Sequence, residues 1–207
     1  MTTSDAPKFR RYAAEERAAM LVQAGLDCLA TGGITAFKVD NICKRAEASR
    51  GLIAHHFGSK DGLLAAVYEA AYQPMLRQID PPDRDDPMPL PELLEVMFDA
   101  ESHGQGALNI WLALWGEVAV NADLRAAHRR NYGRYRAVVE AAIEEHCHAR
   151  GLKVDAAAMA ATVIALVDGQ WLEQCIDPET YDATRARAAA RSLLEPVLGP
   201  MEGDDAH

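Results

Sequence analysis

The chain has 207 residues and a net charge of −10, with 49% hydrophobic and 25% charged residues. This length allows one large or two small domains with a real core, and the composition excludes wholesale disorder. No apolar run approaches the ~20 residues that cross a bilayer, and residues 1–8 lack a signal-peptide segment. We therefore expect a cytoplasmic protein without a membrane partner.

The cysteines predict neither a metal site nor a disulfide framework. They are widely spaced and form no C-x-x-C pair: Cys28, Cys43, Cys147 and Cys175. The run His146-Cys147-His148 resembles a ligand cluster. However, successive helical residues point about 100° apart, so three in a row cannot converge on one metal. We expect a solvated helix end there, and neither metal nor cofactor.

Charge is distributed unevenly along the chain. Residues 1–62 carry nine Lys and Arg against seven Asp and Glu, which is +2. The rest carries 21 − 9 = 12 basic and 31 − 7 = 24 acidic residues, which is −12. A basic N-terminal module held in front of an acidic body is typical of a protein that faces DNA phosphates.

Strand signals are almost absent, so we predict an all-α chain. A first helix is expected over residues 13–31, ended by Gly32-Gly33. A short helix over 39–46 follows, with Phe37 and Ile42 spaced as a hydrophobic staple. The third helix is expected at 50–57, with Ser49 as its N-cap, and the fourth at 60–79 after Ser59.

Prolines and aspartates between residues 80 and 90 predict a connection between two helices of the body. Five further helices are expected, for about nine in total: 90–102, 105–120, 124–150, 155–175 and 178–198. We divide the chain into an N-terminal arm with a helix-turn-helix domain (1–62), a helical-bundle domain (63–198) and a disordered tail (199–207).

Two short helices joined by a tight turn and braced by a longer first helix make a helix-turn-helix unit. The stretch 39–64, VDNICKRAEASRGLIAHHFGSKDGLL, resembles the TetR family signature closely. That signature is a recognition helix ending in His-Phe, then a Lys and a Leu-Leu pair. Here these are His56-Phe57, Lys60 and Leu63-Leu64. The resemblance covers about residues 13–65 and implies a DNA-binding regulator.

Physical chemistry supports several of the implied contacts with double-stranded operator DNA. Arg50 begins the recognition helix and can bond guanine bidentately, and Gly51 lets the backbone approach the DNA. Lys60 lies at a helix start that favours phosphate. His56 either touches DNA or packs. The full set of expected DNA contacts is Lys38, Ser49, Arg50, Gly51, Leu52, Ala54, His55, His56 and Lys60.

The sequence departs from the family pattern at three of these positions or beside them. Ala54 stands where a phosphate-bonding Tyr is usual, and Lys38 and Asp40 stand where Thr and Arg are common. Asp40 would repel phosphate, so it must turn away or pair. A basic arm can compensate through backbone or minor-groove contacts: Lys8, Arg10 and Arg11.

In the body, all three tryptophans fall in two apolar stretches, around Trp111-x-x-x-Trp115 and Asp168-Gly-x-Trp171. This pattern resembles the TetR branch that contains the choline-responsive repressors of glycine betaine synthesis. Aromatic rings with a carboxylate suit a quaternary ammonium. We therefore predict a ligand site at Trp111, Trp115, Asp168 and Trp171. The alternative is that the tryptophans fill the core and Asp168 bonds an internal donor.

The family resemblance implies a homodimer through the last two helices, which matches a palindromic operator. Apolar faces at Ala160, Val163, Ile164 and Val167, and later at Ala188, Leu194 and Val197, are expected to supply the interface. The predicted function is a ligand-responsive repressor released from its operator by a small molecule. An all-helical enzyme and a helical interaction module that does not bind DNA are the alternatives. No nucleophile elbow, phosphate loop or metal motif supports an enzyme.

Overall fold

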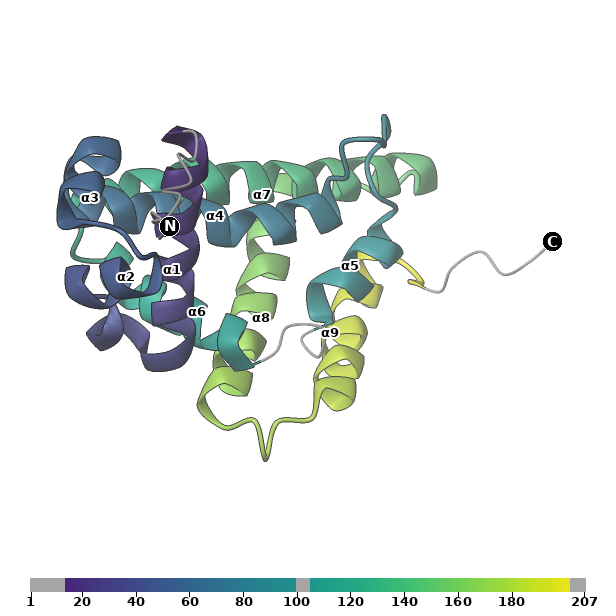
Figure 1. Cartoon of the computed structure of the whole chain (residues 1–207). Helices are drawn as coiled ribbons and strands as arrows, with labels where there is room; N and C mark the ends of the chain where they lie inside the picture. The colour runs from purple at the N-terminus through teal and green to yellow at the C-terminus, as the bar shows by residue number, and fades with distance from the viewer. Residues whose placement is uncertain (1–13, 100–104, 202–207) are drawn as a thin grey trace, which may run out of the picture.

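A computed structural model describes residues 14–99 and 105–201, and within these ranges the only regular elements are helices (Figure 1). In chain order they are α1 (Ala14–Ala36), α2 (Val39–Arg45), α3 (Arg50–Phe57), α4 (Lys60–Ile79), α5 (Leu90–Phe98), α6 (Gln105–Val118), α7 (Ala122–Arg150), α8 (Ala156–Ile176) and α9 (Ala183–Leu198). The predicted all-α class and the predicted number of helices are confirmed for this part of the chain. The basic arm at Lys8, Arg10 and Arg11 lies outside the described residues.

Local signals set the helix ends of the N-terminal module. Gly32 and Gly33 leave helical geometry and kink α1, so one further turn reaches Ala36 beyond the predicted end. Phe37 and Ile42 are both fully buried around the start of α2, as a hydrophobic staple requires. The Ser59 hydroxyl accepts a hydrogen bond of 3.0 Å from the Gly62 amide and caps α4.

Two glycines allow the helices of this module to approach closely. A Cβ on Gly25 of α1 would lie 2.6 Å from the Val67 side chain of α4. A Cβ on Gly62 would lie 2.1 Å from the Phe57 carbonyl oxygen, so only glycine permits the tight passage from α3 into α4. The N-terminal module is thus packed directly on α4.

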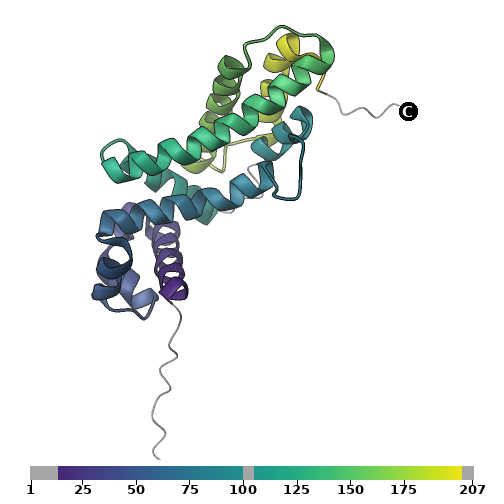
Figure 2. The same ribbon diagram turned by 90° about the horizontal axis from the view of Figure 1, so that it is seen from above.

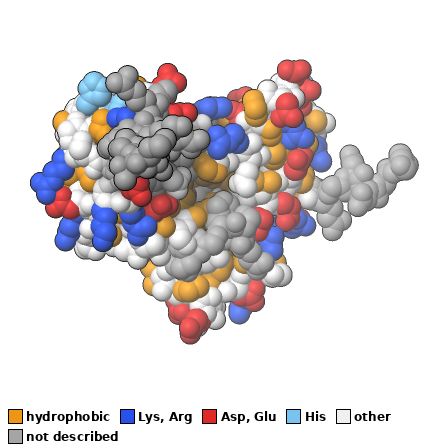
Figure 3. All heavy atoms as spheres, in the orientation of Figure 1, with side chains coloured by type: hydrophobic (Ala, Val, Ile, Leu, Met, Phe, Trp, Pro, Cys, Tyr) orange, Lys and Arg blue, Asp and Glu red, His pale blue; other side chains and the backbone are white. Residues whose placement is uncertain are grey.

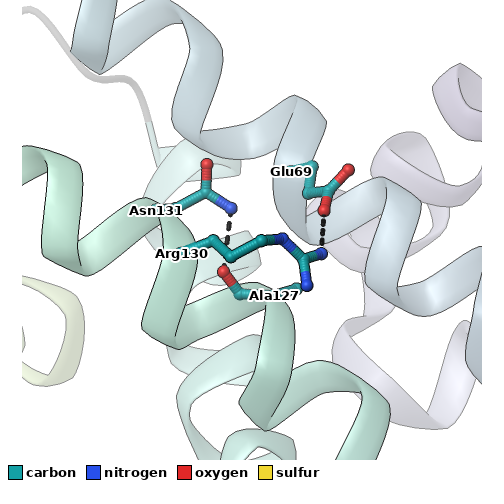
Figure 4. A network of polar contacts seen from close by, with 4 residues as sticks. All are labelled: Glu69, Ala127, Arg130 and Asn131. Atoms are coloured by element: carbon teal, nitrogen blue, oxygen red, sulfur yellow. Dashed lines mark hydrogen bonds and ion pairs between the residues drawn. The ribbon is translucent and has the colours of Figure 1, made fainter.

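Helix α4 continues from the N-terminal module into the body, where it lies along α7 (Figure 2). The Arg130 guanidinium of α7 pairs with the Glu69 carboxylate of α4, while the Asn131 amide donates to the Ala127 carbonyl of its own helix (Figure 4). Helix α6 packs on α1, and a second link between module and body is therefore present. Because α4 crosses residues 62 and 63 without a break, the proposed domain boundary there stays a prediction.

Among the described helices, α1 alone is long and apolar enough to span a membrane by length and composition. A core helix of a globular protein passes the same test. Here α1 packs against α2, α4 and α6.

The structure of the body corrects four expectations. Helix α9 begins at Ala183 after an Asp182 cap, five residues later than predicted, and α5 ends at Phe98. His146 and Cys147 are buried and not solvated, and the His146 Nε2–H donates to the Leu198 carbonyl over 2.8 Å, whereas His148 is exposed as expected. Met201 is also buried, so the expected disordered tail is wrong at this residue. Residues 202–207 lie outside the described range.

The apolar face of α8 that was expected to form the dimer interface is buried within a single chain. Ala160, Val163 and Ile164 have no exposed surface in a single chain, and Val167 is 4% exposed. These side chains pack inside the protomer, so they cannot meet a second copy. The outward side of α8 is a different stripe of small and apolar residues: Ala158, Ala161, Ala165, Gly169, Leu172 and Ile176.

Candidate functional site

Helix α3 has the two faces expected of a recognition helix. Ile53 points inward with 3% of its surface exposed, and Phe57 packs against the core. The opposite face is open to solvent along its length: Arg50, Gly51, Ala54 and His55. Leu52 and His56, which were also expected to touch DNA, are half-buried, and Leu52 packs against the core.

The remaining expected contacts flank α3. Lys38, Ser49 and Lys60 are exposed at the starts of α2, α3 and α4. The Ser49 side chain makes no capping bond, and in the described chain Lys60 forms no ion pair. Lys and Arg side chains gather at the edge of the molecule formed by α2 and α3 (Figure 3). We call the nine predicted contacts between Lys38 and Lys60 the DNA-reading face.

Nothing inside the protein requires glycine at position 51. A Cβ there would meet only the Ser49 hydroxyl, at 3.8 Å, which is ordinary contact, and Gly51 does not have a positive φ. Gly62, by contrast, is fixed by the backbone that crowds it. The missing side chain at Gly51 therefore leaves free space on the outer side of α3, where a DNA backbone or base edge can approach.

Asp40 was expected to turn away or to pair, and it pairs. Its carboxylate forms an ion pair with the Arg50 guanidinium, and both side chains stay largely exposed, at 67% and 72%. The pair joins the first turn of α2 to the first turn of α3.

The second candidate site is a pocket inside the body, with about 650 Å³ of empty space that is partly open to solvent. We call it the aromatic pocket. Its fourteen lining residues come from five helices: Tyr72, Met75, Gln78 and Ile79 of α4; Val96 and Met97 of α5; Trp111 and Trp115 of α6; His128, Tyr132 and Tyr135 of α7; and Val167, Asp168 and Trp171 of α8. The structure thus brings all four predicted ligand residues together.

Asp168 is the one acidic side chain among the residues that line this pocket. Within residues 14–99 and 105–201, no group donates a hydrogen bond to it or forms an ion pair with it. Burial raises the pKa of Asp168 to about 6, because a carboxylate loses hydration there. A partly buried carboxylate without an internal partner favours a cation in the empty space beside it.

The aromatic rings that line the pocket with Asp168 are fixed by contacts with one another and by one hydrogen bond to the backbone. Tyr72 meets Trp111 edge-to-face with ring centroids 4.7 Å apart, and Trp115 lies 6.3 Å from Trp111. The Trp171 ring N–H donates to the Met97 carbonyl over 3.3 Å. Fixed rings present their π-faces without further ordering when a cation enters.

Sequence reasoning missed the tyrosines and His128. His128, Tyr132 and Tyr135 follow one another at spacings of four and three on α7, so they share one face. Tyr68 and Tyr72 are likewise four apart on α4. These spacings were visible in the sequence, but the polar character of α7 made it resemble a surface helix.

One partly buried hydrogen bond connects His128 of the aromatic pocket to Tyr68 of α4. The Tyr68 hydroxyl and the His128 Nδ1 atom lie 2.7 Å apart. Burial raises the pKa of Tyr68 and lowers that of His128, so both groups are neutral at pH 7 and the hydroxyl can donate. A second hydrogen bond joins α6 to the N-terminal module: the Asn109 amide donates to the Ala30 carbonyl of α1 over 3.0 Å.

Two protein-family models match this chain and identify its family. Residues 21–67 match the model of bacterial regulatory proteins of the tetR family, and residues 90–199 match the model of the BetI-type transcriptional repressor C-terminal domain. The chain belongs to the TetR family. It is a ligand-responsive, DNA-binding transcriptional regulator of the BetI type, and the family consists of regulators and not enzymes.

Similar proteins agree with this assignment. The HTH-type transcriptional regulator BetI of Paraburkholderia xenovorans (strain LB400) is 30% identical over 193 residues, which cover 91% of this chain and 96% of that protein. A transcriptional regulator of Pseudomonas aeruginosa PAO1 has a crystal structure with a TM-score of 0.77, at 30% identity, covering 92% of this chain and 94% of its own. A Saccharomonospora viridis regulator in complex with choline shares the fold, with a TM-score of 0.68 and 18% identity, covering 87% and 96%.

Regulators of this family bind operator DNA and small-molecule effectors. The predicted family, fold class and general function of this chain are thereby confirmed. The individual contact residues and the domain boundary stay predictions.

Proposed function

We propose that this TetR-family regulator is a cytoplasmic repressor whose effector is a small quaternary amine such as choline. The observation that carries the proposal is Asp168, a carboxylate without an internal partner in a pocket walled by aromatic rings. A trimethylammonium group has no N–H to donate. Ring faces and one carboxylate suit it better than a set of hydrogen-bond acceptors.

The comparisons support the same ligand class. A regulator with the same fold was crystallised with choline, and the C-terminal domain of this chain matches the BetI-type repressors. The hydroxyl end of choline has polar side chains available in the pocket wall, at Gln78 and His128. The cation would lie between the rings and Asp168.

We propose that the regulator binds a palindromic operator as a homodimer formed by α8 and α9. Helices α8 and α9 meet where the Gln170 amide donates to the Ala186 carbonyl over 3.1 Å, and together they carry four of the exposed large apolar side chains: Leu172, Ile176, Leu193 and Val197. Exposed apolar surface gathered on two adjacent helices is typical of an interface. A two-fold dimer presents two recognition helices to two half-sites.

In this proposal the effector acts on the spacing of the recognition helices. The ligand contacts Trp111 and His128, and both adjoin Tyr68 of α4, the helix that begins beneath the DNA-reading face. A shift of α4 would move the two recognition helices out of register with successive major grooves. The ligand then favours the released state by its differential affinity for the two states.

Calorimetric titration of the purified protein with choline, glycine betaine and tetramethylammonium tests the effector. Choline should bind with one site per chain, and Trp111→Ala should weaken it at least ~10-fold by loss of a cation–π contact and ring packing. Glu144→Gln, which removes an exposed carboxylate from α7 outside the pocket, is the matched control and should leave binding unchanged. An absence of heat with every quaternary amine would exclude this effector class.

Sedimentation analysis tests the interface. Leu193→Glu places a charge on a 62% exposed side chain of α9 and should yield monomers that no longer bind operator. Leu112→Glu changes a 42% exposed leucine of α6 and should leave the dimer intact. A wild-type monomer that binds a palindrome tightly would contradict the dimer.

A further inference from the structure

The ion pair between Asp40 and Arg50 joins a residue of the DNA-reading face, Arg50, to a carboxylate beside it. It connects two helix starts, and both side chains face solvent. A role for Asp40 in DNA recognition rests on the proposed DNA contact of Arg50, because the two side chains are bound to each other.

The guanidinium of Arg50 is in an electrostatically unfavourable position for the free protein. It begins α3, where the exposed N–H groups give the helix a positive end. The Asp40 carboxylate offsets this repulsion and also lies in the first turn of α2, where a negative charge is favoured. Asp40 therefore holds Arg50 across the turn between the two helices.

We propose that Asp40 is a positioning residue that makes Arg50 a reader of a base and not a clamp on a phosphate. Asp40 Oδ1 takes one Nη2 donor of Arg50, and the rest of the five-donor fork stays free. Guanine offers two neutral acceptors in the major groove, and these can be bonded while Asp40 stays in place. A phosphate is an anion, and a carboxylate beside the same guanidinium repels it.

Removing Asp40 should therefore change affinity and specificity in opposite directions. A freed Arg50 gains access to phosphates, so affinity for any duplex should rise. The slope of log K against log salt concentration, the salt slope, should steepen by about one unit or less. Freed of its partner, the fork also samples more orientations, so the preference for one base at the Arg50 position should weaken by about 5-fold or more.

The experiment is a selection of duplexes from a randomised library by the full-length protein, followed by sequencing. Wild type should enrich a palindrome with a guanine at one position of each half-site. Asp40→Asn, nearly the same in shape, should relax that position alone, and Asp40→Glu should restore part of the preference. The salt dependence of binding to one scrambled duplex is measured alongside.

Asp61→Asn is the matched control, since it also removes an exposed carboxylate beside the DNA-reading face without touching Arg50. It should raise affinity for scrambled DNA and leave the selected motif unchanged. Exposed ion pairs add little to stability, so melting curves of these variants should superimpose on that of wild type.

The outcomes separate this inference from the proposed function. If wild-type protein enriches no motif, the proposed operator binding fails. A wild-type motif that Asp40→Asn reproduces at every position overturns the positioning role. The role is also overturned if Asp61→Asn relaxes the same position, because a general charge effect would then suffice.

Discussion

The DNA-reading face and the aromatic pocket are built in opposite ways. The DNA-reading face lies within residues 38–60, on three helix starts and one short helix, and most of it is exposed. The aromatic pocket gathers side chains from residue 72 to residue 171 on five helices, and most of them are partly or fully buried. A local segment can therefore specify the first site, whereas only the assembled body can create the second.

The two regions also use charge differently. Lys60 and the Asp40–Arg50 pair are exposed, so salt screens their interactions. Asp168 is partly buried, which raises its pKa to about 6, so its charge changes with pH. Salt should thus act on DNA binding and pH on effector binding, and substitutions in each region should break one side of this contrast.

The largest expected effect is on effector binding by Asp168→Asn. Losing the counter-charge of a partly buried cation should weaken choline binding by roughly 100-fold or more. Calorimetry measures this loss, and affinity for a selected operator duplex without choline should stay unchanged. Unchanged choline affinity would return Asp168 to a structural role.

The same substitution should stabilise the empty protein. The folded pKa of Asp168, about 6, lies above the ordinary value of 3.8, so the folded state binds more protons between these pH values. The favourable contribution is complete below pH 4 and is lost as pH rises through 6. Asp168→Asn should therefore raise the free energy of unfolding by about 1–3 kcal/mol at pH 7, with the gain shrinking toward pH 4. Denaturant melts at both pH values test this.

The pH dependence of choline binding in wild type is the next largest effect. The ionised form of Asp168 binds the cation, and with a pKa of about 6 in the empty pocket this form dominates above pH 7. Affinity should fall about 10-fold between pH 8 and pH 5, with protons released on binding near pH 6. A pH-independent affinity would show that the carboxylate does not hold the cation.

Lys60→Ala should affect only the DNA-reading face. One lost phosphate contact should lower the salt slope by about one unit and weaken binding roughly 5-fold at 0.15 M salt, equally for selected and scrambled duplexes. Fluorescence anisotropy over a salt series measures both quantities. A loss confined to the selected duplex would instead assign Lys60 to base recognition.

The sequence predicted best what neighbouring residues determine. The Ser59 cap and the Phe37–Ile42 staple act within a few residues, and the helix starts that they mark agree with the structure. Gly32-Gly33 interrupts α1 as predicted, although one further turn follows. Asp168 was found because a charge in an apolar run is conspicuous in any fold. The tyrosines of α7 were missed because that helix has many charges, and only tertiary packing turns one of its faces toward α4 and α8.

The face proposed for the dimer shows the opposite failure. Helix α8 is apolar on nearly every side, so periodicity could not separate the face buried inside the protomer, at Val163, from the outward one, at Leu172 and Ile176. Likewise, the sequence predicted a solvated end of α7, because the residue that hydrogen-bonds His146 there, Leu198 of α9, is far away in the chain. Both errors concern contacts between segments far apart in the chain.

The smallest expected effect concerns the link between the two regions. Tyr68→Phe keeps the ring against Tyr72 and Trp111 and removes the hydroxyl that bonds His128. One such bond contributes about 0.5–1.5 kcal/mol, so the factor by which choline weakens operator binding should fall about two- to tenfold. Operator affinity with and without saturating choline measures this factor.

Because coupling is a difference between two binding free energies, it can change while each affinity alone is nearly preserved. Tyr135→Phe supplies the comparison: it removes another buried hydroxyl from the aromatic pocket, on α7, that forms no hydrogen bond to α4 in the described chain. Its coupling factor should match wild type. An equal drop of the coupling factor in both variants would mean that the polarity of the pocket sets the response. An unchanged coupling factor in Tyr68→Phe would leave the contact between α6 and α1 as the route from effector to DNA.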